Sequence, residues 1–238
     1  MHDRYVNVLP EHYREVLHIN AKEKRFGLLM NIAALLVLVV VLAVAVPLIG
    51  RQNILADAET SLARTSLILL GFVVSMLLYI VLHELVHGLV YHLLTHRKLT
   101  FGLSWSCAFC GVPDIYVCHR TALLALLAPF VTFTLLLVPL TVWLGICAPL
   151  AGLFSAILLG LHLGGCSGDL YVTGLFLFRY RSEDLLMRDT GPEQYFYLPS
   201  DAKGEDSRPE ADSTSDRSDA ASSSAGTVDG DPGEKKEP

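Results

Sequence analysis

Three long stretches without a charged residue constrain this chain more than any other feature. Residues 26–50, 65–83 and 121–168 contain no Asp, Glu, Lys or Arg, and 52% of the 238 residues are hydrophobic. A helix of about 20 apolar residues is long enough to cross the hydrocarbon core of a bilayer. The sequence therefore predicts an all-α membrane protein and argues against an ordinary water-soluble domain.

The apolar stretches predict about four transmembrane helices. Residues 121–168 are too long for one span, and the Ala-Pro-Leu-Ala-Gly sequence around Pro149 provides a break between two helices. The predicted spans are residues 27–49, 66–94, 122–147 and 149–178. Residues 1–26 lack the short basic region and cleavage site of a signal peptide, so we expect the first span to be retained.

Lysine and arginine residues concentrate on alternate sides of the predicted spans. This pattern predicts a multi-pass protein of the cell membrane with its N- and C-termini in the cytoplasm. We expect a cytoplasmic N-terminal segment (1–26), a membrane-embedded domain (27–198) and a disordered acidic tail (199–238). The tail has eleven acidic and five basic residues and no aromatic residue, so it offers too little apolar surface to fold.

The connection between the second and third spans has a different composition. Residues 101–117 are rich in aromatic and β-prone residues, with a turn signal at residues 111–114. This pattern predicts a short interfacial β-hairpin. The chain has no strong basic patch, so no nucleic acid is expected as a partner, and the lipid bilayer is.

A His-Glu-x-x-His motif lies inside the second predicted span. On a helix, His83 and His87 lie on one face, one turn apart, with Glu84 beside them. Two neutral imidazoles in this arrangement can hold one Zn²⁺ ion, and the carboxylate can accept a proton from zinc-bound water. A buried charged carboxylate is costly, and a divalent cation would reduce that cost. The alternative is that these side chains only mark the interfacial end of the helix.

Asp169 is the candidate for a third zinc ligand. It is the acidic residue embedded among apolar spans downstream of Glu84, and three nearby glycines permit local unwinding of the helix. His83 lies roughly 25 Å into the second span and Asp169 roughly 30 Å beyond Pro149, in helices that run in the same direction. The two residues can therefore meet near the cytoplasmic face. An aspartate that has simply reached the interface is the alternative.

Three other histidines lie near these residues. His162 precedes Asp169 by two helical turns, so it could share its face and donate to an oxyanion or to a metal ligand. A packed helix histidine explains His162 equally well. His92 and His96 lie roughly opposite the motif on the helical wheel, which favours solvation at the interface.

The cysteines in the predicted hairpin region carry a weaker signal. Cys107 and Cys110, with Cys118 and His119, could bind a structural zinc ion, but their short spacing is unlike common zinc loops. The spacing favours ordinary membrane-facing thiols.

The motifs together resemble a known family. The segments His-Glu-Leu-Val-His-Gly and Gly-Gly-Cys-Ser-Gly-Asp, with Ala-Pro opening the third span, are similar to small multi-pass membrane proteins called putative zincin peptidases, over roughly residues 60–198. That family resembles the site-two proteases, in which a His-Glu-x-x-His helix and a distant aspartate hold zinc. The resemblance implies His83, His87 and Asp169 as ligands. Leu170 departs from the site-two pattern, which usually has Gly after the aspartate, and no Asn-Pro pair precedes it.

The predicted function is zinc-dependent hydrolysis of peptide bonds within or near the membrane by a metalloendopeptidase. Its cofactor would be Zn²⁺, its catalytic base Glu84, and its substrate a membrane protein or peptide. By analogy with site-two proteases, an edge strand in residues 101–117 would pair with the substrate. The alternative is a non-catalytic zinc-binding membrane scaffold or regulator acting through the acidic tail, or a small transporter component.

Overall fold

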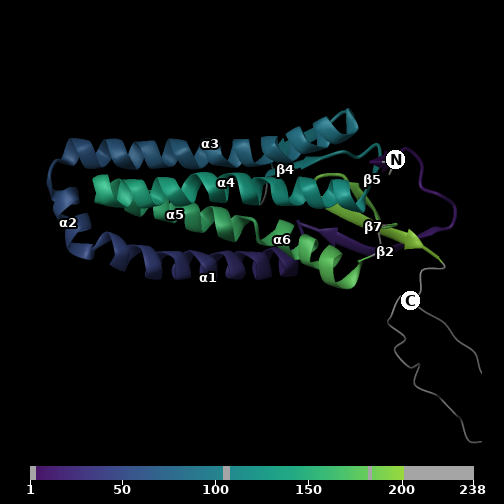
Figure 1. Ribbon diagram of the computed structural model, residues 1–238, viewed down its shortest axis with the longest axis horizontal. Helices are drawn as coiled ribbons and strands as arrows, with labels where there is room; N and C mark the ends of the chain where they lie inside the picture. Colours follow the sequence, from purple (N-terminus) through teal and green to yellow (C-terminus); the bar gives the residue numbers. More distant parts are fainter. Residues whose placement is uncertain (1–3, 104–107, 182–183, 201–238) are drawn as a thin grey trace, which may run out of the picture. The chain divides into compact units, whose positions relative to one another are not determined.

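The computed structural model describes residues 4–103, 108–181 and 184–200. Its helices lie side by side, and strands gather at one of their ends (Figure 1). Within the described residues, four helices are long and apolar enough to cross a membrane, which confirms the predicted number. They are α1 (Lys24–Ile49), α3 (Leu62–Thr95), α4 (His119–Cys147) and the segment Pro149–Arg179.

The fourth of these segments is interrupted. It comprises α5 (Pro149–Gly165), α6 (Ser167–Gly174) and one π-helical turn (Leu175–Arg179). The break falls at Cys166, among the glycines that led us to expect local unwinding. It places Asp169 in the first turn of α6.

A short helix that we had not predicted, α2 (Arg51–Glu59), joins α1 to α3 and fixes the start of α5. Pro149 opens α5, where its missing N–H is no loss. The next N–H, that of Leu150, donates to Asp57 Oδ2 at 3.0 Å, and this bond lowers the pKa of the Asp57 carboxyl group. α2 therefore caps a helix that follows it by about 90 residues.

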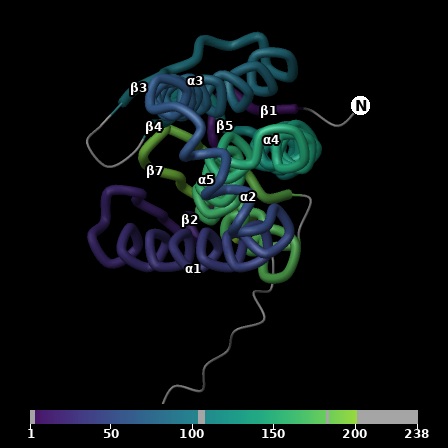
Figure 2. Tube along the Cα trace, turned by 90° about the vertical axis from the view of Figure 1, so that its left-hand side faces the viewer, coloured from purple at the N-terminus to yellow at the C-terminus, as the bar shows by residue number. Residues whose placement is uncertain are grey.

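The helices pack through small residues on α5. A Cβ atom added at Gly164 would lie 2.7 Å from the Ala34 Cα atom of α1, and one added at Gly160 would lie 2.6 Å from the Leu38 side chain. Small residues allow this close approach of backbones in membranes. Viewed along the helices, α1 and α3 lie on opposite sides of α5 (Figure 2).

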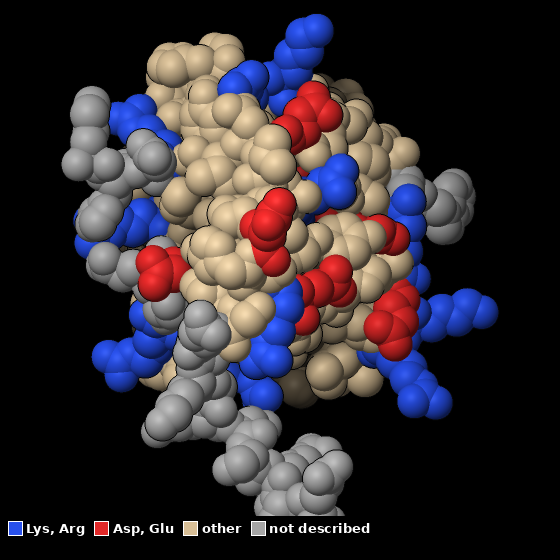
Figure 3. Space-filling view, turned by 90° about the vertical axis from the view of Figure 1, so that its right-hand side faces the viewer, with Lys and Arg blue, Asp and Glu red and all other residues tan. Residues whose placement is uncertain are grey.

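The outer surface of the helices suits lipid. α1 has no buried residue, although most of its residues are Leu, Val, Ala or Ile. The strand end, by contrast, carries interspersed Lys, Arg, Asp and Glu side chains (Figure 3). An apolar surface this large is unusual on a soluble monomer and is expected of a membrane protein.

The strands form a five-stranded antiparallel sheet that sequence analysis missed. Its order is β1-β5-β6-β7-β2. The strands are β1 (Tyr5–Val6), β2 (Tyr13–Asn20), β5 (Tyr116–Cys118), β6 (Leu186–Asp189) and β7 (Glu193–Pro199). The sheet joins the segment before α1 to the segment after α6. The all-α prediction is therefore incomplete, because these short strands pair with partners far away in the sequence, which local patterns do not reveal.

The predicted hairpin region contains a separate two-stranded sheet. β3 (Thr100–Leu103) pairs antiparallel with β4 (Ala108–Gly111), and residues 104–107 between them lie outside the described part. The expected turn at residues 111–114 instead links β4 to β5. Gly111 is required there because a Cβ atom would lie 2.4 Å from the backbone nitrogen of Gly191.

A buried core holds the sheet against the helices. Tyr91 of α3, Phe176 of the π-helical turn and Phe196 of β7 belong to one cluster, and each is at most 1% exposed. Pro199 ends β7, one residue into the predicted tail, and residues 201–238 of that tail lie outside the described part.

Candidate metal centre

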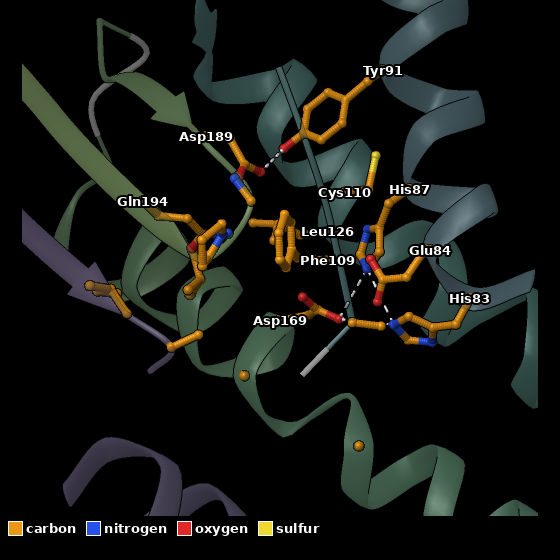
Figure 4. Close-up of a pocket in the computed structure, with 18 of the residues that line it drawn as sticks. His83, Glu84, His87, Tyr91, Phe109, Cys110, Leu126, Asp169, Asp189 and Gln194 are labelled. Atoms are coloured by element: carbon orange, nitrogen blue, oxygen red, sulfur yellow. Dashed lines mark hydrogen bonds and ion pairs between the residues drawn. The ribbon is translucent and has the colours of Figure 1, made fainter. Parts of the chain in front are cut away.

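Two helices bring the predicted ligands together. α3 is continuous over 34 residues, so His83 and His87 project from the same face one turn apart. The break at Cys166 ends α5 and starts α6, whose first turn directs Asp169 toward the two imidazoles (Figure 4). The close contact of Gly164 with α1 anchors the chain just before this break.

The three donor atoms lie at the spacing that zinc requires. His83 Nε2 and His87 Nε2 are 3.2 Å apart, and Asp169 Oδ2 lies 3.5 and 3.4 Å from them. Zinc bonds of about 2.0–2.1 Å in tetrahedral geometry place neighbouring ligand atoms about 3.3 Å apart. The side chains are only 12%, 10% and 21% exposed. The residues present therefore fit a zinc ion with one coordination position left for substrate or water.

The tautomer of His87 follows from its partner. His87 Nδ1 lies 2.8 Å from the backbone carbonyl oxygen of Ala125 in α4. A carbonyl only accepts, so Nδ1 carries the proton and Nε2 presents its lone pair to the centre. The Ala125 carbonyl is available because its usual helical partner would be the N–H of residue 129, which is proline. Pro129 therefore leaves the Ala125 carbonyl free to accept the hydrogen bond that orients His87.

Glu84 faces the same cavity as the three donors but is not one of them (Figure 4). Cys110 of β4 lines this cavity together with Glu84. The two-stranded sheet therefore borders the carboxylate as well as the donors. This is the placement that a general base needs.

The donors line a cavity of about 210 Å³ between the helices and the strands. Phe109 of β4 and Gln194 of β7 form part of its wall, together with Phe26 at the start of α1. The strands therefore contribute to the site. β4 lies within residues 101–117, where an edge strand was expected beside the substrate, whereas the contribution of β7 was not predicted.

A buried pair on the strand side of the cavity was also missed. The Tyr91 hydroxyl, one turn beyond His87, donates to Asp189 Oδ2 at 2.7 Å, and the Gly191 N–H donates to Asp189 Oδ1 at 2.8 Å. Burial raises the pKa of Asp189 to about 6 despite these donors. The pair ties the turn between β6 and β7 to α3. Only the spacing of Tyr91 from His87 could have indicated this role.

The other predicted histidines lie outside the triangle of donors. His162 is completely buried and contacts the Tyr79 hydroxyl, which also contacts His83. Its predicted role beside the metal stays a prediction. His92 and His96 are exposed and contact each other, with ring centroids 5.9 Å apart.

The cysteine predictions fare differently. Cys110 is buried at the cavity wall, so the membrane-facing position expected for it is wrong. Burial, and to a lesser extent Asp189, raises the pKa of this thiol to about 12. Among the described residues, no group of possible metal ligands includes Cys110 or Cys118. Cys107 lies outside the described part.

Comparison with known proteins agrees with this geometry. No curated protein and no solved structure matches the chain. One family does match, over a region that begins in α3 and includes both segments that supply the three donor atoms. It is the family that the motifs resemble. Residues 76–183, which contain His83, Glu84, His87 and Asp169, match the family described as "Putative zincin peptidase".

Proposed function

We propose that this protein is a zinc-dependent endopeptidase with His83, His87 and Asp169 as its metal ligands. The observation that carries the proposal is the triangle of three donor atoms, 3.2 to 3.5 Å apart, with Glu84 in the same cavity. The family match supports zinc and peptidase chemistry. The resemblance to site-two proteases supports the assignment of an aspartate from a distant helix as the third ligand.

The residues of the chain divide the reaction between them. Zinc held by the three donors would polarise a peptide carbonyl and acidify a water molecule. Glu84, which lines the same cavity, accepts a proton from water as the water oxygen attacks the carbonyl carbon. The same carboxyl group then donates the proton to the amine nitrogen as the C–N bond breaks.

The position of the cavity favours cleavage close to a membrane surface. α3 ends at Thr95, so His87 lies about 12 Å of helix rise before the end of its helix. Strands outside the spans form part of the cavity wall. A membrane protein or peptide with a locally extended segment near the surface is the proposed substrate class. β2 and β7 pair in one sheet, which supports placing both termini on one side, and the charge pattern assigns that side to the cytoplasm.

The decisive variant is Glu84→Gln in the full-length protein purified in detergent. We expect it to keep one zinc ion per chain and to lose hydrolysis of a fluorescence-quenched peptide library by about 10²- to 10⁴-fold, because the general base is removed. Zinc content is measured by elemental analysis, and removal of residues 201–238 is the control.

Hydrolysis by Glu84→Gln at the wild-type rate would exclude Glu84 as the base. The non-catalytic scaffold would be favoured if wild type held zinc and hydrolysed no peptide in the library.

A further inference from the structure

Tyr79 connects the centre to a second buried histidine. It precedes His83 by one turn on α3, and its hydroxyl lies 3.0 Å from His83 Nδ1. The same hydroxyl lies 2.9 Å from His162 Nδ1 on α5. A phenol has one proton to donate, so it can donate to one of these nitrogens while it accepts from the other.

The metal end and the far side of His162 agree on one direction for these hydrogen bonds. For His83 Nε2 to present its lone pair to the centre, His83 Nδ1 must carry the proton, which the Tyr79 oxygen accepts. Tyr79 then donates to His162 Nδ1, so His162 carries its proton on Nε2, 3.1 Å from Thr134 Oγ1 on α4, which can accept it.

Aromatic rings surround this chain, and the Cys166 thiol is a further polar neighbour, with its Sγ atom 3.7 Å from His162 Nδ1. Phe133 lies edge-on to Tyr79, with centroids 5.1 Å apart, and also contacts the rings of His83 and His162. His162 is 0% exposed. Water therefore has little room to replace the Tyr79 hydroxyl if it is removed.

We propose that Tyr79, His162 and Thr134 form a directed hydrogen-bond chain that holds His83 in its Nδ1–H tautomer and so sets the affinity of the centre for zinc. These are positioning residues, since none of them touches the metal position. The inference rests on the proposed zinc centre. The other tautomer of His83 would carry a proton on Nε2, facing His87 Nε2 and Asp169 Oδ2, and could not bind a cation.

A rival use of the same atoms makes a different prediction. His83, His162 and Cys166 also offer three ligand atoms within 4.8 Å of one another. A second metal ion there would displace the Tyr79 hydroxyl from its two imidazoles. It would give two zinc ions per chain in wild type, and one of them would be lost in Cys166→Ser.

The hydrogen-bond chain is tested directly by zinc affinity. This affinity is measured by competition with a chelator on the full-length protein in detergent. Removal of such a partner typically weakens metal binding about 10- to 100-fold, and we expect this loss in Tyr79→Phe. Thr134→Val should show a smaller loss in the same direction because the Tyr79 hydroxyl still contacts His83. Tyr79→Phe combined with His162→Gln should be no worse than Tyr79→Phe alone, whereas independent packing defects would add.

The matched control is Thr141→Val. Thr141 lies two turns beyond Thr134 on α4 and is hydrogen-bonded at 2.8 Å to Ser155 of α5. It is buried between the same two helices, so its loss should lower the melting temperature and leave zinc affinity unchanged. Zinc affinity of Tyr79→Phe within twofold of wild type, or two zinc ions with one lost in Cys166→Ser, would overturn the proposal. Absence of zinc from wild type would instead overturn the proposed function.

Discussion

The two imidazoles of the centre sit on one helix, yet their surroundings differ. On the strand side, His87 is oriented by a backbone carbonyl, that of Ala125. On the membrane side, His83 is oriented by the Tyr79 side chain, which leads to His162. On the strand side, Pro129 leaves one carbonyl of α4 without its helical partner, and this backbone group orients an imidazole. Deeper among the helices, most backbone groups are paired within their own helices, and side chains supply the partners of His83.

Removal of the ligand that both histidines share should cause the largest loss of zinc affinity, because it affects the strand side and the membrane side alike. Asp169 Oδ2 lies within 3.5 Å of both Nε2 atoms. We expect Asp169→Ala to weaken zinc binding by more than the loss of an outer partner, that is, by more than about 100-fold. Elemental analysis after dialysis measures the loss, and Asp57→Ala, a change at a carboxylate of α2, is the control. Retention of stoichiometric zinc by Asp169→Ala would refute the assigned ligand.

A smaller effect is expected at the buried pair on the strand side. Burial raises the pKa of Asp189 to about 6 from an ordinary value of 3.8, so the folded state binds more protons between these values. The contribution of this group to stability is therefore full below about pH 4 and declines as pH rises to about 6. We expect Asp189→Asn to abolish this decline. Melting temperatures of both proteins, measured in detergent with a chelator, give the difference curve.

If the two melting curves ran parallel from pH 4 to 7, the shifted carboxyl group would not be Asp189. Zinc affinity of Asp189→Asn at pH 7 should stay within a few-fold of wild type, since Tyr91 and Asp189 do not contact the donor atoms. A large loss of zinc would mean that the strand side controls the ligands through more than the Ala125 carbonyl.

The sequence predicted what depends on local pattern and missed what depends on distant pairing. The four long helices and the three donors follow from apolar stretches and from residue spacing. Asp169 could be predicted because a carboxylate among apolar spans is costly. β2 and β7 could not, because each becomes a strand by pairing with residues about 180 positions away. Tyr79 was missed for a similar reason: a tyrosine in an apolar helix is unremarkable until His162 is placed beside it.

Among the residues that orient the two imidazoles, the smallest effect on zinc affinity is expected at Pro129. Its replacement is the sharpest test of the contrast between backbone and side-chain partners. Pro129→Ala restores an N–H that competes with His87 for the Ala125 carbonyl, which has two lone pairs and can serve both. We expect zinc affinity to fall less than in Tyr79→Phe, by less than about 10-fold, while helix stability rises. Pro139→Ala is the matched control, since Pro139 lies on the same helix and does not line the metal cavity. Equal losses of zinc affinity in the two proline variants would show that backbone rigidity of α4 matters. A loss of zinc affinity confined to Pro129→Ala would show that this proline serves to present one carbonyl oxygen to a metal ligand.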